Sequence, residues 1–171
     1  GKSDLAAYDK RRYSTLRGYA QDILDICDEL ALSDVTLVGH SVSAIIGMLA
    51  AIERPQLFRA LVMVSPSPAY INDGDYTGGF TRADIDGLLE TLDNNYLGWA
   101  ATMAPVIMGA PEQPGLAAEL TNSFCRTDPE IAKQFARATF LSDHRADLPR
   151  CPVPALIVQC THDAIAPVFV G

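Results

Sequence analysis

The chain has 171 residues, of which 49% are hydrophobic, so it is long enough for one domain of ordinary size with a substantial core. Asp and Glu number 21 against 13 Lys and Arg, and the net charge of -8 argues against binding along a nucleic-acid phosphate backbone. No apolar run is long enough to span a membrane. The four cysteines have no metal-binding spacing, so we expect no metal or other cofactor, and they suit the reducing cytoplasm.

The first third of the chain predicts a helix and then a strand–helix–strand unit. Between residues 14 and 30, apolar side chains recur at helical spacing. Val35–Val38 is a short apolar strand, 43–53 is a helix that is apolar on nearly every side, and 60–65 is a second apolar strand. The short links between them predict a βαβ unit with parallel strands.

A four-helix insertion is predicted after the second strand. Residues 66–80 are rich in Pro, Gly and Asp, and helical patterns follow with no strand among them. Thr81 with Asp84 three residues later is a capping box that begins the first of these helices, and Asp128-Pro129 begins the last. An insertion of this kind usually covers a functional site.

A third apolar strand at 155–160 returns the chain to the sheet. The predicted architecture is therefore an α/β fold, with a mostly parallel sheet, helices on both of its faces and a four-helix cap. Its predicted parts are a partial core over 1–65, a helical cap over 66–150 and a second, truncated part of the core over 151–171.

The segment Gly39-His40-Ser41-Val42-Ser43 joins the first strand directly to the buried helix. A serine at such a corner has a strained backbone, and its hydroxyl is lifted clear of the sheet. The residues two before and two after it must be small because strand and helix nearly touch. The pattern G-x-S-x-S alone also fits a serine that caps a helix. Its place between a strand and a helix favours Ser41 as a nucleophile, with the Val42 N–H as an oxyanion donor.

A serine nucleophile needs a general base and an acid that orients the base. Asp163 lies in the loop after the third strand, where such an acid belongs, although a solvated loop acid would look the same in the sequence. Asp143 and Asp147 are alternatives, but they follow a helix and are expected to cap it or pair locally.

None of the three histidines suits the role of general base. His40 adjoins Ser41 and is expected to point elsewhere, His144 lies at a polar helix exit as a surface or hinge residue, and His162 points away from its neighbour. Either the base lies beyond Gly171 in a longer chain or the protein is not catalytic. The abrupt ends of the sequence favour a longer parent chain, and the fragment alone is expected to be inactive.

Four long motifs stand in order along the chain: "VGHSVSAIIGMLAAIERPQLF" (38–58), "SPSPAYINDGDYTGGF" (65–80), "FCRTDPEIAKQFARATFLSDHRADL" (124–148) and "VPALIVQCTHDAIAP" (153–167). Together they resemble the RsbQ-like group of α/β-hydrolases, which includes a bacterial stress-response regulator and plant karrikin and strigolactone receptors. The resemblance implies an α/β-hydrolase core with a four-helix cap, and it implies that flanking parts of the fold lie outside this sequence.

The resemblance also implies roles for individual residues. Ser41 would be the nucleophile, Asp163 the triad acid and Val42 one of two oxyanion donors. It further implies five residues that line a substrate pocket, for which packing within the core or cap is the alternative. These five are Tyr70, Phe80, Trp99, Met103 and Phe140.

These features predict a cofactor-independent serine hydrolase that acts on a small apolar ester or lactone, with a role in stress signalling implied by the resemblance. The alternative is a ligand sensor with little turnover that binds a protein partner through its cap. A carbon–carbon bond hydrolase or cofactor-free peroxidase of the same fold would keep the same serine. We expect a cytoplasmic protein with no nucleic-acid or membrane partner.

Overall fold

The computed structural model describes residues 3–171 and contains a three-stranded parallel sheet, one helix packed against it, a second helix packed on the first, and a four-helix insertion. The strands lie in the order β1-β2-β3, with Val38 paired to Val62 and Val62 paired to Leu156. Short 3-10 turns join some of the elements. The main elements are α1 (Leu16–Glu29), β1 (Val35–His40), α2 (Val42–Glu53), β2 (Phe58–Val64), α3 (Arg82–Asn94), α4 (Tyr96–Met108), α5 (Pro114–Cys125), α6 (Pro129–Phe140) and β3 (Ala155–Val158).

The predicted fold class and order of elements are confirmed, and only the ends of some elements differ. The third strand ends at Val158 and not at residue 160. The carbonyl of Val158 accepts the N–H of Ser65 at 2.8 Å. Ser65 is the first residue after β2, so β3 pairs with its neighbouring strand only as far as Val158. None of the helices within residues 3–171 is long and apolar enough to cross a bilayer.

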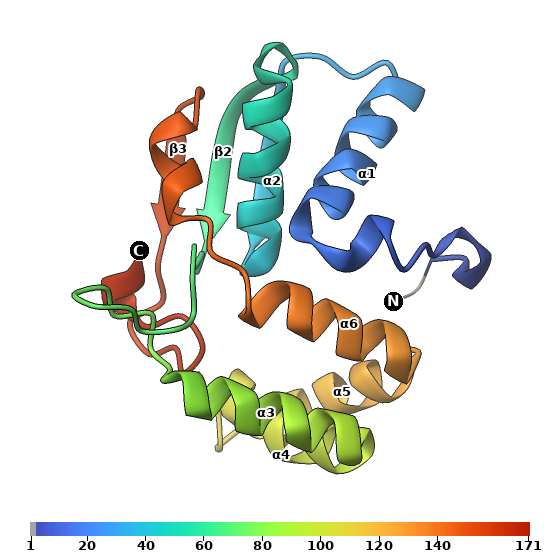
Figure 1. The fold of residues 1–171 in the computed structure, drawn as a ribbon, viewed down its shortest axis with the longest axis vertical. Coiled ribbons are helices and arrows are strands. Elements are labelled where there is room, and N and C mark those ends of the chain that lie inside the picture. The colour runs from blue at the N-terminus through green and yellow to red at the C-terminus, as the bar shows by residue number, and fades with distance from the viewer. Residues whose placement is uncertain (1–2) are drawn as a thin grey trace.

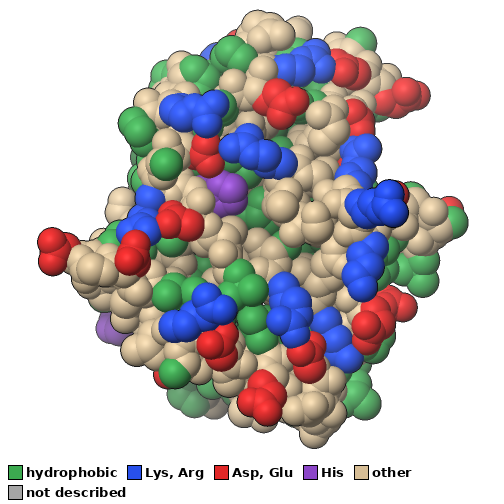
Figure 2. Space-filling model, in the orientation of Figure 1, with side chains coloured by type: hydrophobic (Ala, Val, Ile, Leu, Met, Phe, Trp, Pro, Cys, Tyr) green, Lys and Arg blue, Asp and Glu red, His purple; other side chains and the backbone are tan. Residues whose placement is uncertain are grey.

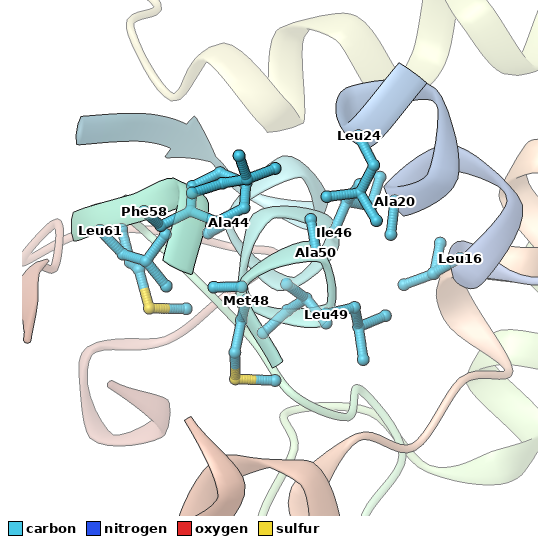
Figure 3. Close-up of a cluster of buried hydrophobic side chains, with 14 of the residues drawn as sticks. Leu16, Ala20, Leu24, Ala44, Ile46, Met48, Leu49, Ala50, Phe58 and Leu61 are labelled. Carbon is cyan, nitrogen blue, oxygen red and sulfur yellow. The ribbon is translucent and has the colours of Figure 1, made fainter. Parts of the chain in front are cut away.

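The main core lies between the sheet and the pair α1 and α2. Helix α1 buries one face, whose residues lie three or four positions apart, as expected for an amphipathic helix. The buried residues of that face are Leu16, Ala20, Leu24 and Cys27. Figure 3 shows this face turned toward Ile46, Leu49 and Ala50 of α2. Because α2 also contacts β1 and β2, it is buried along most of its length.

Part of the sheet is uncovered within residues 3–171. Strands of a parallel sheet are usually buried on both faces. In β1 and β3, however, Val38 is 68% exposed, Leu156 is 60% exposed and Val158 is 46% exposed. These apolar side chains are therefore in contact with water in the described part of the chain.

The four helices α3 to α6 lie beyond the carboxyl ends of the strands (Figure 1). Both helix starts expected from the sequence are confirmed. The Thr81 hydroxyl accepts the N–H of Asp84 at 3.1 Å, and the Asp84 carboxylate accepts the N–H of Thr81 at 2.8 Å. The Asp128 carboxylate accepts the N–H groups of Glu130 and Ile131 at 2.9 and 3.1 Å. These caps fix where the insertion's first and last helices begin.

The insertion returns to the core at the point where it left. The N–H of His144, after α6, donates to the carbonyl of Pro68, before α3, at 2.8 Å. The His144 Nδ1 lies 2.9 Å from a carboxylate oxygen of Asp147, and the His144 side chain is only 12% exposed, so His144 is largely covered at this junction, which we call the hinge. Arg17 of α1 and Arg150 contact the same carboxylate at 3.3 and 2.8 Å.

The hinge predicts a pH-dependent contribution to stability. The hydrogen bond with His144, and then the charges of Arg17 and Arg150, lower the pKa of Asp147. Its stabilising effect is therefore complete above an unfolded pKa of about 4 and is lost as the pH falls through the lower folded value. We predict that Asp147→Asn lowers the free energy of unfolding by about 1–3 kcal/mol at pH 7, because the largely covered His144 ring and two arginines lose a charged acceptor.

Urea unfolding of the wild type and of Asp147→Asn at several pH values measures this effect. The difference between them should shrink below about pH 4, where the carboxyl first becomes protonated in the unfolded wild type and then, at lower pH, in the folded protein. A difference that stays constant down to pH 2 would contradict the assignment.

Candidate active site

Ser41 is the single residue between β1 and α2. Its backbone has φ 56° and ψ -127°, which costs a residue with a side chain about 1–3 kcal/mol. The Ser41 N–H donates to the carbonyl of Val64 in β2 at 2.8 Å, and its own carbonyl accepts the N–H of Ala44 at 3.0 Å. These two bonds hold the corner in its strained shape. The strain expected from the sequence is thus confirmed.

Gly39 lies where the end of β1 touches the start of α2. A Cβ at this position would lie 2.6 Å from the backbone of Ala44 and 2.6 Å from the carbonyl oxygen of Ser43, which no side chain can tolerate. The predicted size limit at residue 39 is therefore confirmed. Ser43 itself takes part through its carbonyl, and its side chain is exposed, so close packing restricts residue 43 less than we expected.

The N–H of Val42 begins α2 and is one of the groups that a helix leaves without an internal acceptor. The Ser41 side chain makes no capping hydrogen bond, and the first turn of α2 contains no acidic residue. Ser41 therefore occupies the N-cap position of α2, but the interpretation that its side chain caps the helix is wrong. The positive end of α2 and its unused N–H groups are available to negative charge that develops beside Ser41.

Asp163 lies in the loop after β3, at the same edge of the sheet as Ser41. Its Oδ1 accepts the N–H groups of Ile165 and Ala166 at 2.8 and 2.9 Å, and its Oδ2 has no hydrogen-bond partner within residues 3–171. β1 and β3 both neighbour β2, so their ends are about 10 Å apart, or two strand spacings. That separation leaves room for one imidazole between the serine and the acid.

The two alternative acids are occupied elsewhere. Asp143 binds Arg145, with a closest separation of 2.6 Å. Asp147 is held in the buried hinge by His144, Arg17 and Arg150. Both pair locally, as expected, and neither carboxylate is free to orient a base beside Ser41.

Among residues 3–171, no histidine hydrogen-bonds to Ser41 or Asp163. His40 is exposed at the end of β1, and the ring of His162 lies 3.2 Å from the Thr161 hydroxyl. His144 belongs to the hinge. The described chain therefore carries positions suited to a nucleophile and an acid, with no base between them.

Tyr70 lies near both halves of this candidate site. Its side chain is buried, and burial is the main reason that its pKa is raised. A hydrogen bond with the Ser41 side chain lowers the pKa, whereas the negative charge of Asp163 raises it. The phenol therefore lies within the electrostatic reach of both residues. The sequence predicted Tyr70 as pocket lining and carried no signal that it would lie beside these two groups.

All five residues expected to line a pocket meet in one apolar cluster. Tyr70 and Trp99 are among its buried members, and Phe80, Met103 and Phe140 pack against them. The rings of Tyr70 and Phe140 meet edge to face with centroids 5.1 Å apart. The structure brings the five together, and their role as a substrate pocket stays a prediction.

Two features of this cluster were missed from the sequence. Ile165, two residues after Asp163, packs against it and so joins the acid-bearing loop to the cap. The indole Nε1 of Trp99 is buried without a hydrogen-bond partner in residues 3–171. A buried donor without a partner is costly, and it is typical of a place where a water or ligand binds. The one feature of the sequence that could have indicated this contact is that Ile165 is apolar and closely follows the proposed triad acid.

The chain belongs to the α/β hydrolase family, whose model matches residues 4–171. The family expected from the sequence motifs is thus confirmed.

Three relatives show how far the likeness extends. Over all 171 residues, the chain is 44% identical to a probable esterase of Oryza sativa subsp. japonica and 42% identical to the karrikin insensitive 2 receptor CA of Petunia hybrida. The solved structure of olei00960, a hydrolase from Oleispira antarctica, superposes on 99% of the chain with a TM-score of 0.96 and 44% identity. The chain spans 63% of the length of each of these three proteins.

We predict that two Gly→Ala changes, one at the corner beside Ser41 and one in α3, have opposite effects on stability. Gly39→Ala should lower the free energy of unfolding by about 1–3 kcal/mol, because its methyl group would overlap the backbone of α2. Gly87→Ala is the matched control, since it lies inside α3 with open space around it. It should raise that free energy by about 0.5–1 kcal/mol. Denaturant unfolding measures both, and a neutral Gly39→Ala would show that strand and helix are not in contact.

Proposed function

We propose that the protein containing this chain is a cofactor-independent serine hydrolase that cleaves a small apolar ester or lactone. The observation that carries the proposal is the strained Ser41 at the N-terminal end of α2, with its hydroxyl not used as a cap. Membership of the α/β hydrolase family and the esterase name of one relative support it. The apolar cluster reached through Tyr70 suits an apolar acyl or lactone group.

In the proposed mechanism, a histidine takes the proton of the Ser41 hydroxyl as its oxygen attacks the substrate carbonyl. The negative charge that develops on the carbonyl oxygen accepts a hydrogen bond from the Val42 N–H. Asp163 orients the histidine and stabilises its positive charge. The histidine then gives the proton to the leaving alkoxide, the acyl group stays on Ser41, and water releases it in a second attack with the same base.

The base and a second oxyanion donor would come from parts of the protein outside these 171 residues. Two observations support this part of the proposal: no histidine within residues 3–171 hydrogen-bonds to Ser41 or Asp163, and the chain spans 63% of the length of these relatives. We also propose that residues 66–150 act as a cap over Ser41, between core parts at 1–65 and 151–171. The four free cysteines support a cytoplasmic protein, and a role in stress signalling rests on the sequence resemblance alone.

A second candidate function is a ligand sensor that turns over slowly and binds a protein partner through its cap. The receptor name of the Petunia hybrida relative favours it. Exposed apolar side chains on the cap also favour it: Leu97 and Val106 of α4 and Leu116 of α5 are 62%, 47% and 36% exposed. Apolar side chains of this size that stay exposed are available to a protein partner.

The catalytic assignment is tested in the full-length protein with an aryl acetate as substrate. Ser41→Ala should lower kcat by at least about a thousandfold, because the nucleophile is lost. Asp163→Asn should lower it by roughly a hundred- to ten-thousandfold, because the histidine loses its orientation. Asp143→Asn is the matched control and should keep a rate close to that of the wild type. If Asp143→Asn is the slow variant and Asp163→Asn is not, the acid is misassigned.

Kinetics over several turnovers separate the enzyme from the sensor. A metabolic hydrolase should release many equivalents of product per protein molecule at a constant rate. A sensor should release about one equivalent and then stop, with the acyl group retained on the protein and visible by intact mass spectrometry. Rapid, sustained turnover with no retained adduct would rule out the sensor.

A further inference from the structure

A second candidate binding site has a lining separate from Ser41. A groove of about 690 Å³ separates the N-terminal segment and the start of α1 from α6. Its volume falls in the range of about 300–1,000 Å³ that is usual for small-molecule sites. Its lining includes neither Ser41 nor Asp163, nor any residue of the apolar cluster that contains Tyr70 and Trp99. Figure 1 shows the N-terminal segment and α1 facing α6 across this region.

The groove is more positive than the rest of the molecule. Four cationic side chains line it, from the N-terminal segment, α1 and α6: Lys10, Arg17, Lys133 and Arg137. Three carboxylates also line it: Asp93, Glu130 and Asp143. One charge of each sign is paired outside the lining: Asp143 with Arg145, and Arg17 with Asp147. The groove thus has an excess of positive charge in a chain whose net charge is -8. Figure 2 shows Lys and Arg side chains gathered around this region.

The cations are available to a ligand. Lys133 pairs at 2.9 Å with Glu130, whose side chain is 80% exposed, and such surface pairs contribute little and exchange readily. Arg17 lies 3.3 Å from Asp147 and its side chain is 51% exposed. Arg137 contacts Asp93 in another exposed pair. Lys10 makes no ion pair within residues 3–171.

The start of α1 adds to the positive potential of the groove. Thr15, Leu16 and Arg17 line it and form the first turn of a 14-residue helix. Thr15 makes no side-chain cap, and the first turn contains no acidic residue, so the positive end of the helix is not compensated. The hydroxyl of Tyr8, also in the lining, is buried and has no hydrogen-bond partner within residues 3–171. The carboxylates of Asp9 and Asp128 also lie near Tyr8, so Tyr8 offers the anion a hydrogen-bond donor and the cations of the groove supply the positive charge.

We propose that this groove binds a small organic anion that carries a phosphate or carboxylate group. Lys133 and Arg137 of α6 hold it from the cap side, and Lys10, Arg17 and the first turn of α1 hold it from the core side. The bound anion therefore ties the cap to the core. The site is separate from the proposed hydrolysis and does not depend on it.

Isothermal titration of the full-length protein with pyrophosphate and with citrate, at constant ionic strength, tests the proposal. At least one probe should bind saturably. Lys133→Gln and Lys10→Gln should each weaken it by about tenfold, because each removes a charge-assisted hydrogen bond. Arg82→Gln is the matched control: it also breaks an ion pair on a helix surface, with Asp86 of α3, but lies outside the groove.

The outcomes separate clearly. Stronger binding of pyrophosphate assigns a phosphate ligand, and stronger binding of citrate assigns a carboxylate. Binding that survives in Ser41→Ala shows that the groove acts independently of the active site. The proposal is overturned if neither probe binds saturably, or if Lys133→Gln and Lys10→Gln bind as tightly as Arg82→Gln. None of the three substituted side chains is buried, so these variants should fold.

Discussion

The corner at Ser41 is the constraint on which the rest of the site depends. A serine with φ 56° is stable there only because the elements on both sides of it cannot move. α2 is packed against the sheet and α1, and the N–H of Ser41 is bonded to Val64 of the neighbouring strand. Gly39 allows the strand and helix to approach closely enough for this turn. Burial of the helix therefore offsets the local strain and aims the N-terminal end of α2 at the edge of the sheet.

The order of the strands places the other half of the candidate site. Because β2 lies between β1 and β3, the residues that follow β1 and β3 face each other across one strand. That distance suits two side chains bridged by an imidazole, and it is too long for a direct bond between Ser41 and Asp163. The insertion begins just after β2, so the chain brings Tyr70 close enough for both residues to influence its pKa. A parallel sheet with this connectivity thus brings distant residues to one edge.

Local patterns in the sequence were enough for the elements and for the corner, but not for contacts between distant segments. The capping boxes, the helical stripe of α1 and the turn at Ser41 each depend on residues within a few positions of one another. The neighbourhood of Tyr70, the buried hinge at His144 and the groove beside Lys133 depend on how α6 and the N-terminal segment pack. The spacing of residues along the sequence does not predict such contacts, because tertiary packing determines them.

Helix α6 takes part in both of the sites described. Ala132, Ala136 and Phe140 pack in the apolar cluster, and Phe140 contacts Tyr70. Lys133 and Arg137, on another face of the same helix, line the groove. A ligand in either site changes the affinity of the other only if it favours one position of α6 over another, and any such coupling acts equally in both directions. A shift of α6 caused by a ligand in the groove would then reach the proposed substrate pocket through the contact between Phe140 and Tyr70.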